Sequence, residues 1–258
     1  MGILNVTPDS FAGDGVTEPD TAVTHGRRLL AEGADLIDLG GESSRPGAAS
    51  VSLIDELRRV IPVVERLIGD SGAVVSVDTK KAEVARRALR AGAAMVNDVS
   101  ALRADPEMTS VIAEAGVPVV LMHARSQPPV QASSAADIMA EIQSFLAERM
   151  EVAIAGGIPR ERLLIDPGFG FGKTVKENLD LLRRLGDLRT LGRPIVIGTS
   201  RKGTIGKVLG GLPVTQRLEG TAATVAVAIT QGADIIRVHD VAAMIRVARM
   251  TDAIVRSG

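Results

Sequence analysis

Seven times along this chain, a glycine leads into a short apolar run that ends at a polar or small residue. Two of these repeats are Gly33–Gly40 (GADLIDLG) and Gly232–Asp240 (GADIIRVHD). Glycine suits the left-handed residue that ends a helix. Apolar runs without alternation are typical of parallel strands that helices cover on both faces. Each repeat therefore predicts the end of a helix followed by a buried parallel strand.

The number of repeats indicates a closed barrel. The other five repeats occupy residues 72–78, 92–98, 116–123, 157–166 and 192–198. The segment Gly2–Asn5 (GILN) adds an eighth strand at the start of the chain. Eight strand–helix units in 258 residues match the size of a (β/α)8 TIM barrel, in which catalytic groups come from the C-terminal ends of the strands. We expect one α/β barrel domain over residues 1–258.

Composition narrows the class of partner. Lys and Arg total 30 against 31 for Asp and Glu, and no basic stretch alternates with aromatic residues, so we expect no nucleic-acid partner. No apolar run reaches the length of a membrane span, so no membrane partner is expected. The absence of cysteine and of a charged leader before an apolar segment favours a cytoplasmic location. A small-molecule substrate is the favoured partner.

Polar residues gather at the C-terminal ends of the predicted strands, which a closed barrel brings to one mouth. They are Asn5, Asp38, Asp78, Asn97, His123, Asp166, Ser200–Lys202, Arg237 and His239. Asp78, Asn97 and Asp166 could together bind the edge of a flat, nitrogen-rich ring such as a pterin or purine, because carboxylates accept from N–H groups and asparagine both donates and accepts.

Each of these three residues also has a local interpretation. Asp78 could help to begin the helix that follows Thr79. Asp98 rather than Asn97 could be the residue that matters, as part of a turn. Asp166 could belong to an Asp-Pro-Gly turn. For any one of these residues taken alone, the sequence favours the local role over a role in binding.

Cations at the same end of the barrel predict an anionic ligand. Donors of the kind that a phosphate or pyrophosphate requires come from Arg45, Lys202, Arg237 and His239. Guanidinium and ammonium groups bind such oxygens through charge-assisted hydrogen bonds. For each cation taken alone, the sequence favours a solvated surface charge over a ligand contact.

The aromatic residues are few and concentrated. The chain has four Phe and no Trp or Tyr, and Phe11, Phe169 and Phe171 all fall in loops that follow strands. These rings could pack against a planar ligand, or they could cap the core of the barrel. The sequence leaves both interpretations open.

Seven sequence strings, most of which contain these residues, occur in order along the chain. They are MGILNVTPDSF (1–11), GESSRPG (41–47), SVDT (76–79), NDVS (97–100), IDPGFGFGK (165–173), SRK (200–202) and RVH (237–239). In this order they resemble the dihydropteroate synthase family. The resemblance runs from Met1 to the last predicted helix, and its first and fifth strings are far more specific than a glycine pattern alone.

The resemblance implies an alkyl-group transferase of folate biosynthesis. Such an enzyme joins 6-hydroxymethyl-7,8-dihydropterin pyrophosphate to p-aminobenzoate and releases pyrophosphate and 7,8-dihydropteroate. Sulfonamides would compete with p-aminobenzoate. The resemblance also implies Mg2+ as a cofactor and a homodimer that pairs through the last helices.

The resemblance assigns residues to the pterin and to the pyrophosphate. By position, the group around the pterin is Asp78, Asn97, Met122, Asp166, Phe171, Gly198 and Lys202. Asn5 would be the Mg2+ ligand beside the pyrophosphate, where the metal neutralises charge on the departing group. Arg237 and His239, with Ser44 nearby, would hold the pyrophosphate oxygens.

Residues in the first two loops would complete the site. In the family, the C–O bond breaks largely before the amine attacks. Asp9, Phe11 and Arg45 would close over the cationic pterin and shape the p-aminobenzoate pocket. Closure keeps water from trapping the cation, and donors aimed at the pyrophosphate oxygens ease its departure. The implied catalytic residues are therefore Asp9, Arg45 and Lys202.

The chain departs from the family pattern at three places. Ser44 stands where the family usually has Thr, and Gly203 stands where Ser or a bulkier residue is common. Residues 11–17 read FAGDGVT where FSDGG is typical. The first two departures touch the p-aminobenzoate side of the site. These departures therefore put full turnover and sulfonamide sensitivity in question more than they do pterin binding.

Two alternatives to the synthase are kept. One is a methyltransferase that passes a methyl group from methyltetrahydrofolate to a corrinoid protein, since that family shares the barrel and the pterin-edge residues but needs no pyrophosphate site. The other is a pterin-binding paralogue or redesign without synthase turnover, which the altered loops and the first strand directly after Met1 motivate.

Overall fold

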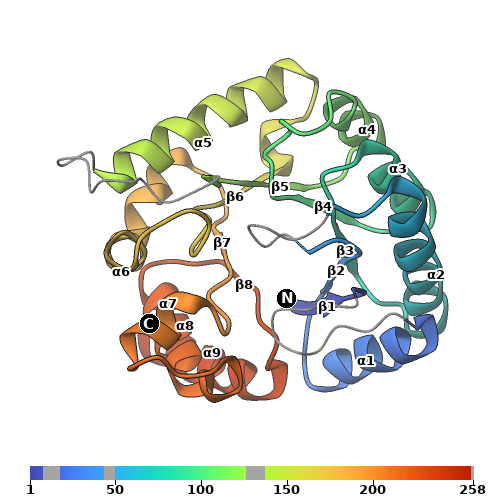
Figure 1. Cartoon of the computed structure of the whole chain (residues 1–258). Helices are drawn as coiled ribbons and strands as arrows, with labels where there is room; N and C mark the ends of the chain where they lie inside the picture. Colours follow the sequence, from blue (N-terminus) through green and yellow to red (C-terminus); the bar gives the residue numbers. More distant parts are fainter. Residues whose placement is uncertain (8–17, 44–49, 126–136, 257–258) are drawn as a thin grey trace.

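Eight short parallel strands surround a central axis and are enclosed by helices (Figure 1). The computed structural model describes residues 1–7, 18–43, 50–125 and 137–256. The strands are β1 Gly2–Asn5, β2 Ile37–Gly40, β3 Val75–Asp78, β4 Met95–Asp98, β5 Val119–Met122, β6 Leu163–Asp166, β7 Val196–Ile197 and β8 Ile235–Ile236. Each strand falls within a segment that the sequence predicts as a strand.

Helices connect the strands around the outside. The α-helices are α1 Pro19–Ala31, α2 Leu53–Ser71, α3 Ala82–Arg90, α4 Met108–Ala115, α5 Ile138–Ala155, α6 Val175–Arg183, α7 Gly203–Val208, α8 Leu218–Thr230 and α9 Val241–Val255. The described residues also contain the 3-10 helices η1 Arg160–Arg162, η2 Leu185–Leu191 and η3 Val214–Gln216. Within the described residues, no helix combines the length and apolarity needed to span a membrane.

Parallel pairing closes the ring of strands. β1 to β6 pair in sequence order, and β7 pairs with β8. Bridges from Ile165 to Ile195 and from Gly2 to Val238 join the two sheets at both seams. The predicted (β/α)8 barrel is confirmed.

The glycine repeats have the backbone conformation that the sequence predicts. All seven repeat glycines have positive φ, between 61° and 105°. Gly72 is the clearest example: it is the left-handed C-cap of α2, and its N–H donates to the Ile68 carbonyl. The chain then turns directly into β3, so each repeat couples the end of a helix to the start of a strand.

The interior of the barrel is divided into an apolar and a polar half. Val120, Leu164 and Val196 form a small cluster that is separate from the main core, together with the partly buried Met95 and Ile235. These residues come from the consecutive strands β4 to β8. Across the barrel, the neighbouring positions Asp38 and Ser76 are polar and fully buried. The polar half therefore begins below the strand ends that form the mouth.

Two glycines at the end of α2 allow a test of the predicted cap. A Cβ added at Gly72 or at Gly69 would meet nothing within 4 Å, so any effect of alanine arises from the backbone. Gly72→Ala should lower the free energy of unfolding by about 1 kcal/mol, because an L-residue is strained in the left-handed conformation.

Gly69→Ala is the matched control. Gly69 lies inside α2 with ordinary helical geometry, so alanine should raise the free energy of unfolding by about 0.5–1 kcal/mol. Urea unfolding of both variants gives the two values. Changes of the same sign at both positions would contradict the capping role of Gly72.

Candidate active site

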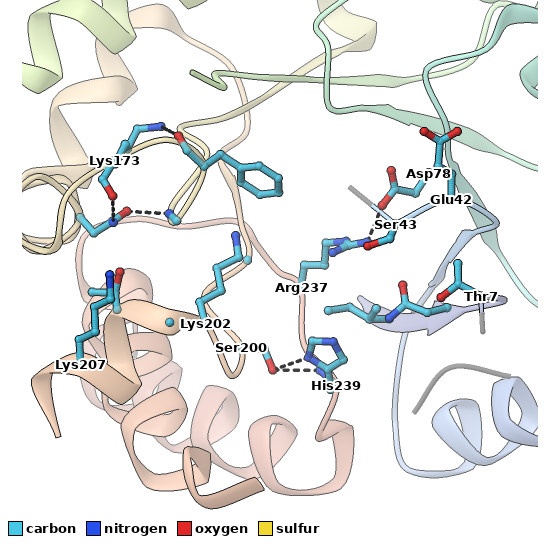
Figure 2. A pocket seen from close by; sticks show the side chains of 18 residues that line it. Thr7, Glu42, Ser43, Asp78, Lys173, Ser200, Lys202, Lys207, Arg237 and His239 are labelled. Carbon is cyan, nitrogen blue, oxygen red and sulfur yellow. Dashed lines mark hydrogen bonds and ion pairs between the residues drawn. The ribbon is translucent and has the colours of Figure 1, made fainter. Parts of the chain in front are cut away.

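A cavity of about 310 Å³ lies at the mouth of the barrel and is lined largely by side chains from the C-terminal ends of the strands (Figure 2). Seven residues predicted from the sequence line this cavity: Asn5, Asp78, Phe171, Gly198, Lys202, Arg237 and His239. They come from five of the eight strand ends or from the loops that follow them. The structure therefore brings together groups that are more than two hundred residues apart in sequence.

The remaining predicted residues fall into two groups. Asn97, Met122 and Asp166 end β4, β5 and β6, are buried, and do not line the cavity itself. The register places Asn97 beside Asp78, which lines the cavity, and Met122 beside Asp166. The Asp166 carboxylate acts on the charge of Lys202, which also lines the cavity. The other predicted residues lie outside the part of the chain that the structure describes; these are Asp9, Phe11, Ser44 and Arg45.

Strand register explains why the first polar residues meet. Asn5 pairs with Gly40, Gly40 with Asp78, and Asp78 with Asn97. These four positions form one continuous row across β1 to β4. Because parallel strands in register point equivalent side chains to the same face, Asn5, Asp78 and Asn97 face the interior side by side.

Arg237 is the centre of a buried polar network in this cavity. Its Nε donates to Asp38 Oδ2 at 2.5 Å, and its Nη2 donates to Asp78 Oδ2 at 2.7 Å. Asn97 Nδ2 donates to the same Asp38 oxygen at 2.9 Å. The residues predicted for an anion and for a ring edge are therefore joined in one network. Asp38 links them, although the sequence only marked it as a strand end.

Burial and charge shift the pKa values of these groups. Burial raises the pKa of Asp78 to about 7, and the nearby carboxylates of Asp38 and Glu56 add to the rise, whereas the Arg237 guanidinium opposes it. Although burial disfavours its charge, Asp38 and Asp78 hold the pKa of Arg237 above its ordinary value. Asp78 can therefore gain or lose a proton near neutral pH.

Lys202 and Phe171 form the opposite wall of the cavity. Lys202 Nζ donates to the Phe169 carbonyl and lies 4.4 Å from the centroid of the Phe171 ring. Burial lowers the pKa of Lys202 to about 8, while the Asp166 carboxylate opposes the shift. Phe171 lines the cavity and Phe169 is completely buried. One ring thus fits each of the two interpretations that the sequence left open.

The loop that carries Phe171 is held from within by Lys173. Lys173 Nζ donates to the carbonyls of His123 at 3.2 Å, Gly168 at 2.8 Å and Phe171 at 3.4 Å. A Cβ on Gly168, which has φ of 68°, would lie 1.8 Å from the His123 carbonyl oxygen. The sequence assigned no role to Lys173. The sequence feature that could have identified its role is its place at the end of a glycine-rich string, since the loop formed by such a string can bring backbone carbonyls together.

The structure supports two of the three local roles that the sequence suggested for the strand-end residues and contradicts the third. Asp166 Oδ1 accepts from the Gly168 N–H at 2.7 Å, so Asp166 does form the Asp-Pro-Gly turn. Asp98 accepts from the backbone of Ser100 and Leu102, so it is the turn residue beside Asn97. Asp78 does not begin α3, whose N-cap is Lys81.

The turns after β7 and β8 are fastened to each other. Arg201 has φ of 57°, and it forms an ion pair with Asp240. The Arg201 N–H donates to Thr221 Oγ1 at 3.0 Å. Ser200 Oγ lies 2.9 Å from His239 Nδ1. These contacts position Ser200 and His239 on one wall of the cavity and Lys202 beside them.

A second ionic cluster supports the wall near β2. Glu42 lines the cavity, and Lys80 Nζ lies 2.8 Å from its Oε1. Lys81 forms ion pairs with both Glu42 and the buried Glu56. Burial would raise the pKa of Glu42, but these two lysines hold it below its ordinary value. Glu42 is therefore a charged, anchored residue of the cavity wall after β2.

No cluster of three or more His, Cys, Asp or Glu side chains that could hold a metal occurs in the described ranges. The candidate metal ligand is Asn5, whose amide oxygen is a hard donor at the edge of the cavity. Mg2+ is commonly bound through one or two protein oxygens together with substrate phosphates and waters. The donor set therefore fits Mg2+ better than a metal that needs several imidazole or thiolate ligands.

The comparisons with known proteins all point to the same family. Residues 1–239 match the family model described as pterin binding enzyme. The chain is 45% identical to the dihydropteroate synthase of Bacillus subtilis, covering 100% of this chain and 89% of that protein. The Yersinia pestis dihydropteroate synthase, solved with a sulfonamide drug complex, has a TM-score of 0.94 and 44% identity, covering 100% of this chain and 94% of the other.

A third relative was solved with a reaction product. The Xanthomonas albilineans dihydropteroate synthase in complex with 7,8-dihydropteroate has a TM-score of 0.87 and 46% identity. The match covers 98% of this chain and 92% of that one. This chain is therefore similar to these synthases in both sequence and structure over nearly the full length of each.

Proposed function

Because the chain belongs to the pterin-binding enzyme family and matches its dihydropteroate synthases over nearly its whole length, we propose that it condenses 6-hydroxymethyl-7,8-dihydropterin pyrophosphate with p-aminobenzoate. The products are 7,8-dihydropteroate and pyrophosphate, in folate biosynthesis. We further propose that residues 1–258 act as one pterin-binding barrel domain. The observation that carries the proposal is the cavity at the barrel mouth, which Asp78, Lys202 and the Phe171 ring line together.

In this proposal, the pterin lies in the inner part of the cavity. Asp78, Asn97 and Asp166 supply acceptors and an amide for the nitrogen-rich edge of the ring. Phe171 offers an aromatic face at the wall, with Lys202 Nζ above it, and planar ligands pack favourably on such a face. Met122 and Gly198 contribute small or apolar surface around the ring.

The pyrophosphate lies toward the ends of β1, β7 and β8. Asn5, Ser200 and His239 line this side, and Arg237 lies between it and the inner part of the cavity. Two carboxylates already orient the Arg237 guanidinium. Donors that are oriented before the reaction stabilise developing negative charge without reorganisation. We assign Arg237 and His239 to the pyrophosphate oxygens, together with Ser44 outside the described residues.

We propose Asn5 as the protein ligand of Mg2+. When bound beside the pyrophosphate, Mg2+ neutralises part of its negative charge. The side chain of Asn5 lines the cavity, where its carboxamide oxygen can bind the metal. The remaining ligands would come from phosphate oxygens and water, as is usual for Mg2+.

The reaction breaks one bond and forms another at the same carbon. The C–O bond between the pterin methylene and the pyrophosphate breaks, and its electron pair leaves with the oxygen. The amine nitrogen of p-aminobenzoate then bonds to that methylene carbon and releases a proton. Arg237 and His239 stabilise the departing oxygens. Asp9, Phe11 and Arg45 are proposed to exclude water while the carbon is electron-poor.

The full-length likeness to synthases supports this reaction over a corrinoid methyltransferase. The ends of β7 and β8 add specific support. They place Ser200, Arg237 and His239 on one side of the cavity, and a methyl transfer has no pyrophosphate for these donors to bind.

Incubation with both substrates and Mg2+ should release pyrophosphate and form 7,8-dihydropteroate in equal amounts. A coupled pyrophosphate assay and chromatography of the product measure the two yields. Omitting p-aminobenzoate is the control for hydrolysis of the pterin pyrophosphate. Tight binding of the pterin substrate by calorimetry without any product would instead select the paralogue without turnover.

The affinity for the pterin substrate should fall as the pH drops through about 7. Protonation of Asp78 removes a carboxylate acceptor, so the charged form is the binding form. Asp78→Asn should weaken binding by about tenfold or more, since a hydrogen bond to a charged group contributes about 1.5–3 kcal/mol. The variant should also bind with less dependence on pH.

Calorimetric titrations at pH values below and above 7 measure both effects. Asp35→Asn is the matched control, because Asp35 is exposed and precedes β2 at the other end of the barrel. This control should keep the wild-type affinity and pH dependence. Tighter binding by the wild type at the lower pH would contradict the assignment of Asp78.

We propose a homodimer that pairs through α8 and α9. These helices expose large apolar side chains, namely Leu218, Val227, Met250, Ile254 and Val255. A shallow apolar depression lies between the two helices. An exposed apolar surface of this kind is typical of a protein interface, and a second copy presents the same surface in a twofold pair.

Light scattering should give the mass of two chains for the wild type. Met250→Glu should shift the population to single chains, because a charge would be buried without a partner. Val152→Glu, at an exposed apolar position on α5, should leave the dimer intact. Equal dissociation of both variants, or a monomeric wild type, would contradict this interface.

A further inference from the structure

One face of α7 forms part of the cavity wall. Gly203, Thr204 and Lys207 all line the cavity. Residues that are three or four positions apart lie on the same face of a helix, so this lining follows from the helical geometry of α7. Figure 2 shows Lys202 between Lys207 on one side and Arg237 on the other in this view. In this view, the wall therefore carries a cation on the side of Lys202 that is away from Arg237.

The cations that line the cavity differ in what they contact. Arg237 forms ion pairs with two carboxylates. Lys202 donates to the Phe169 carbonyl, and Lys173 donates to three backbone carbonyls. Among the described residues, Lys207 forms no ion pair. Its side chain is exposed, so within the described part of the chain its ammonium group is open to a ligand.

The wall beside Lys207 has space for a ligand. A Cβ added at Gly203 would meet nothing within 4 Å, so the helix face next to Lys207 is open. Thr204 adds a hydroxyl to the same face. Lys207 follows Lys202 by five residues, which corresponds to about 7.5 Å along a helix axis. A benzene ring with polar groups at opposite ends fits a wall of this length.

We propose that Lys207 binds the carboxylate of p-aminobenzoate and so selects an acidic arylamine. The inference rests on the proposed function, which supplies a substrate with an amine at one end and a carboxylate at the other. With the amine directed toward the pterin methylene near Lys202, the carboxylate lies toward Lys207. A charge-assisted hydrogen bond from the ammonium group then fixes the outer end of the ring.

Lys207 contacts the substrate away from the reacting atoms, which predicts a specific kinetic pattern. An interaction that is equally strong before and during the reaction changes KM and leaves kcat unaltered. With saturating pterin pyrophosphate, Lys207→Met should raise KM for p-aminobenzoate by about tenfold, which corresponds to about 1.4 kcal/mol. KM for p-aminobenzamide, which has no negative charge, should stay at the wild-type value.

Two further variants complete the experiment. Lys207→Arg retains the positive charge and should recover most of the wild-type KM. Lys176→Met removes an exposed lysine on α6 that does not line the cavity, and it should leave all constants unchanged. Thermal unfolding of each variant verifies that the fold is intact, since Lys207 is exposed and its replacement disturbs no packed core.

The outcomes separate this inference from the function on which it rests. A wild type that forms no dihydropteroate overturns the proposed function and the inference with it. A wild type that turns over, with the same KM for p-aminobenzoate in Lys207→Met, overturns the inference alone. An equal rise in KM for the acid and the amide also overturns it, because that result indicates a role in packing rather than charge.

Discussion

The buried contact of Arg237 with Asp38 and Asp78 is the interaction on which the site depends. Arg237 follows β8, which has only two strand residues, while its partners come from β2 and β3. The guanidinium thus connects the last strand to the polar half of the barrel interior. Buried ion pairs cost desolvation and are weak evidence for stability. This one holds Arg237 and Asp78 in fixed positions and, through Asp38, also Asn97. It also keeps the pKa of Asp78 from rising further.

Much of the fold and the location of the site follow from local sequence. Each repeat glycine combines a helix end and a strand start, and a short apolar strand has few alternatives once its parallel neighbours form. The polar residue after each apolar run then reaches the barrel mouth regardless of side-chain detail. This is why Asn5, Asp78 and His239 could be placed at the cavity from the sequence.

Contacts within the mouth could not be predicted in the same way. Phe169 and Phe171 both lie between glycines in the same string, and only the three-dimensional course of the loop buries one and exposes the other to the cavity. Asp38 and Arg237 are 199 residues apart, and their contact depends on the register around the whole barrel. Lys173 binds carbonyl groups that exist as a cluster only after the loop has folded.

The turn after β7 shows that positioning has a conformational cost. A non-glycine residue with positive φ, such as Arg201, costs about 1–3 kcal/mol and persists only where its surroundings determine it. Glycine would adopt this conformation without strain, but it could not form the ion pair with Asp240. Arg217 also donates to the Arg201 carbonyl at 2.9 Å. The side chain of Arg201 therefore contributes what glycine lacks: it ties the β7 turn to the β8 turn and so places Lys202 and His239 on one wall.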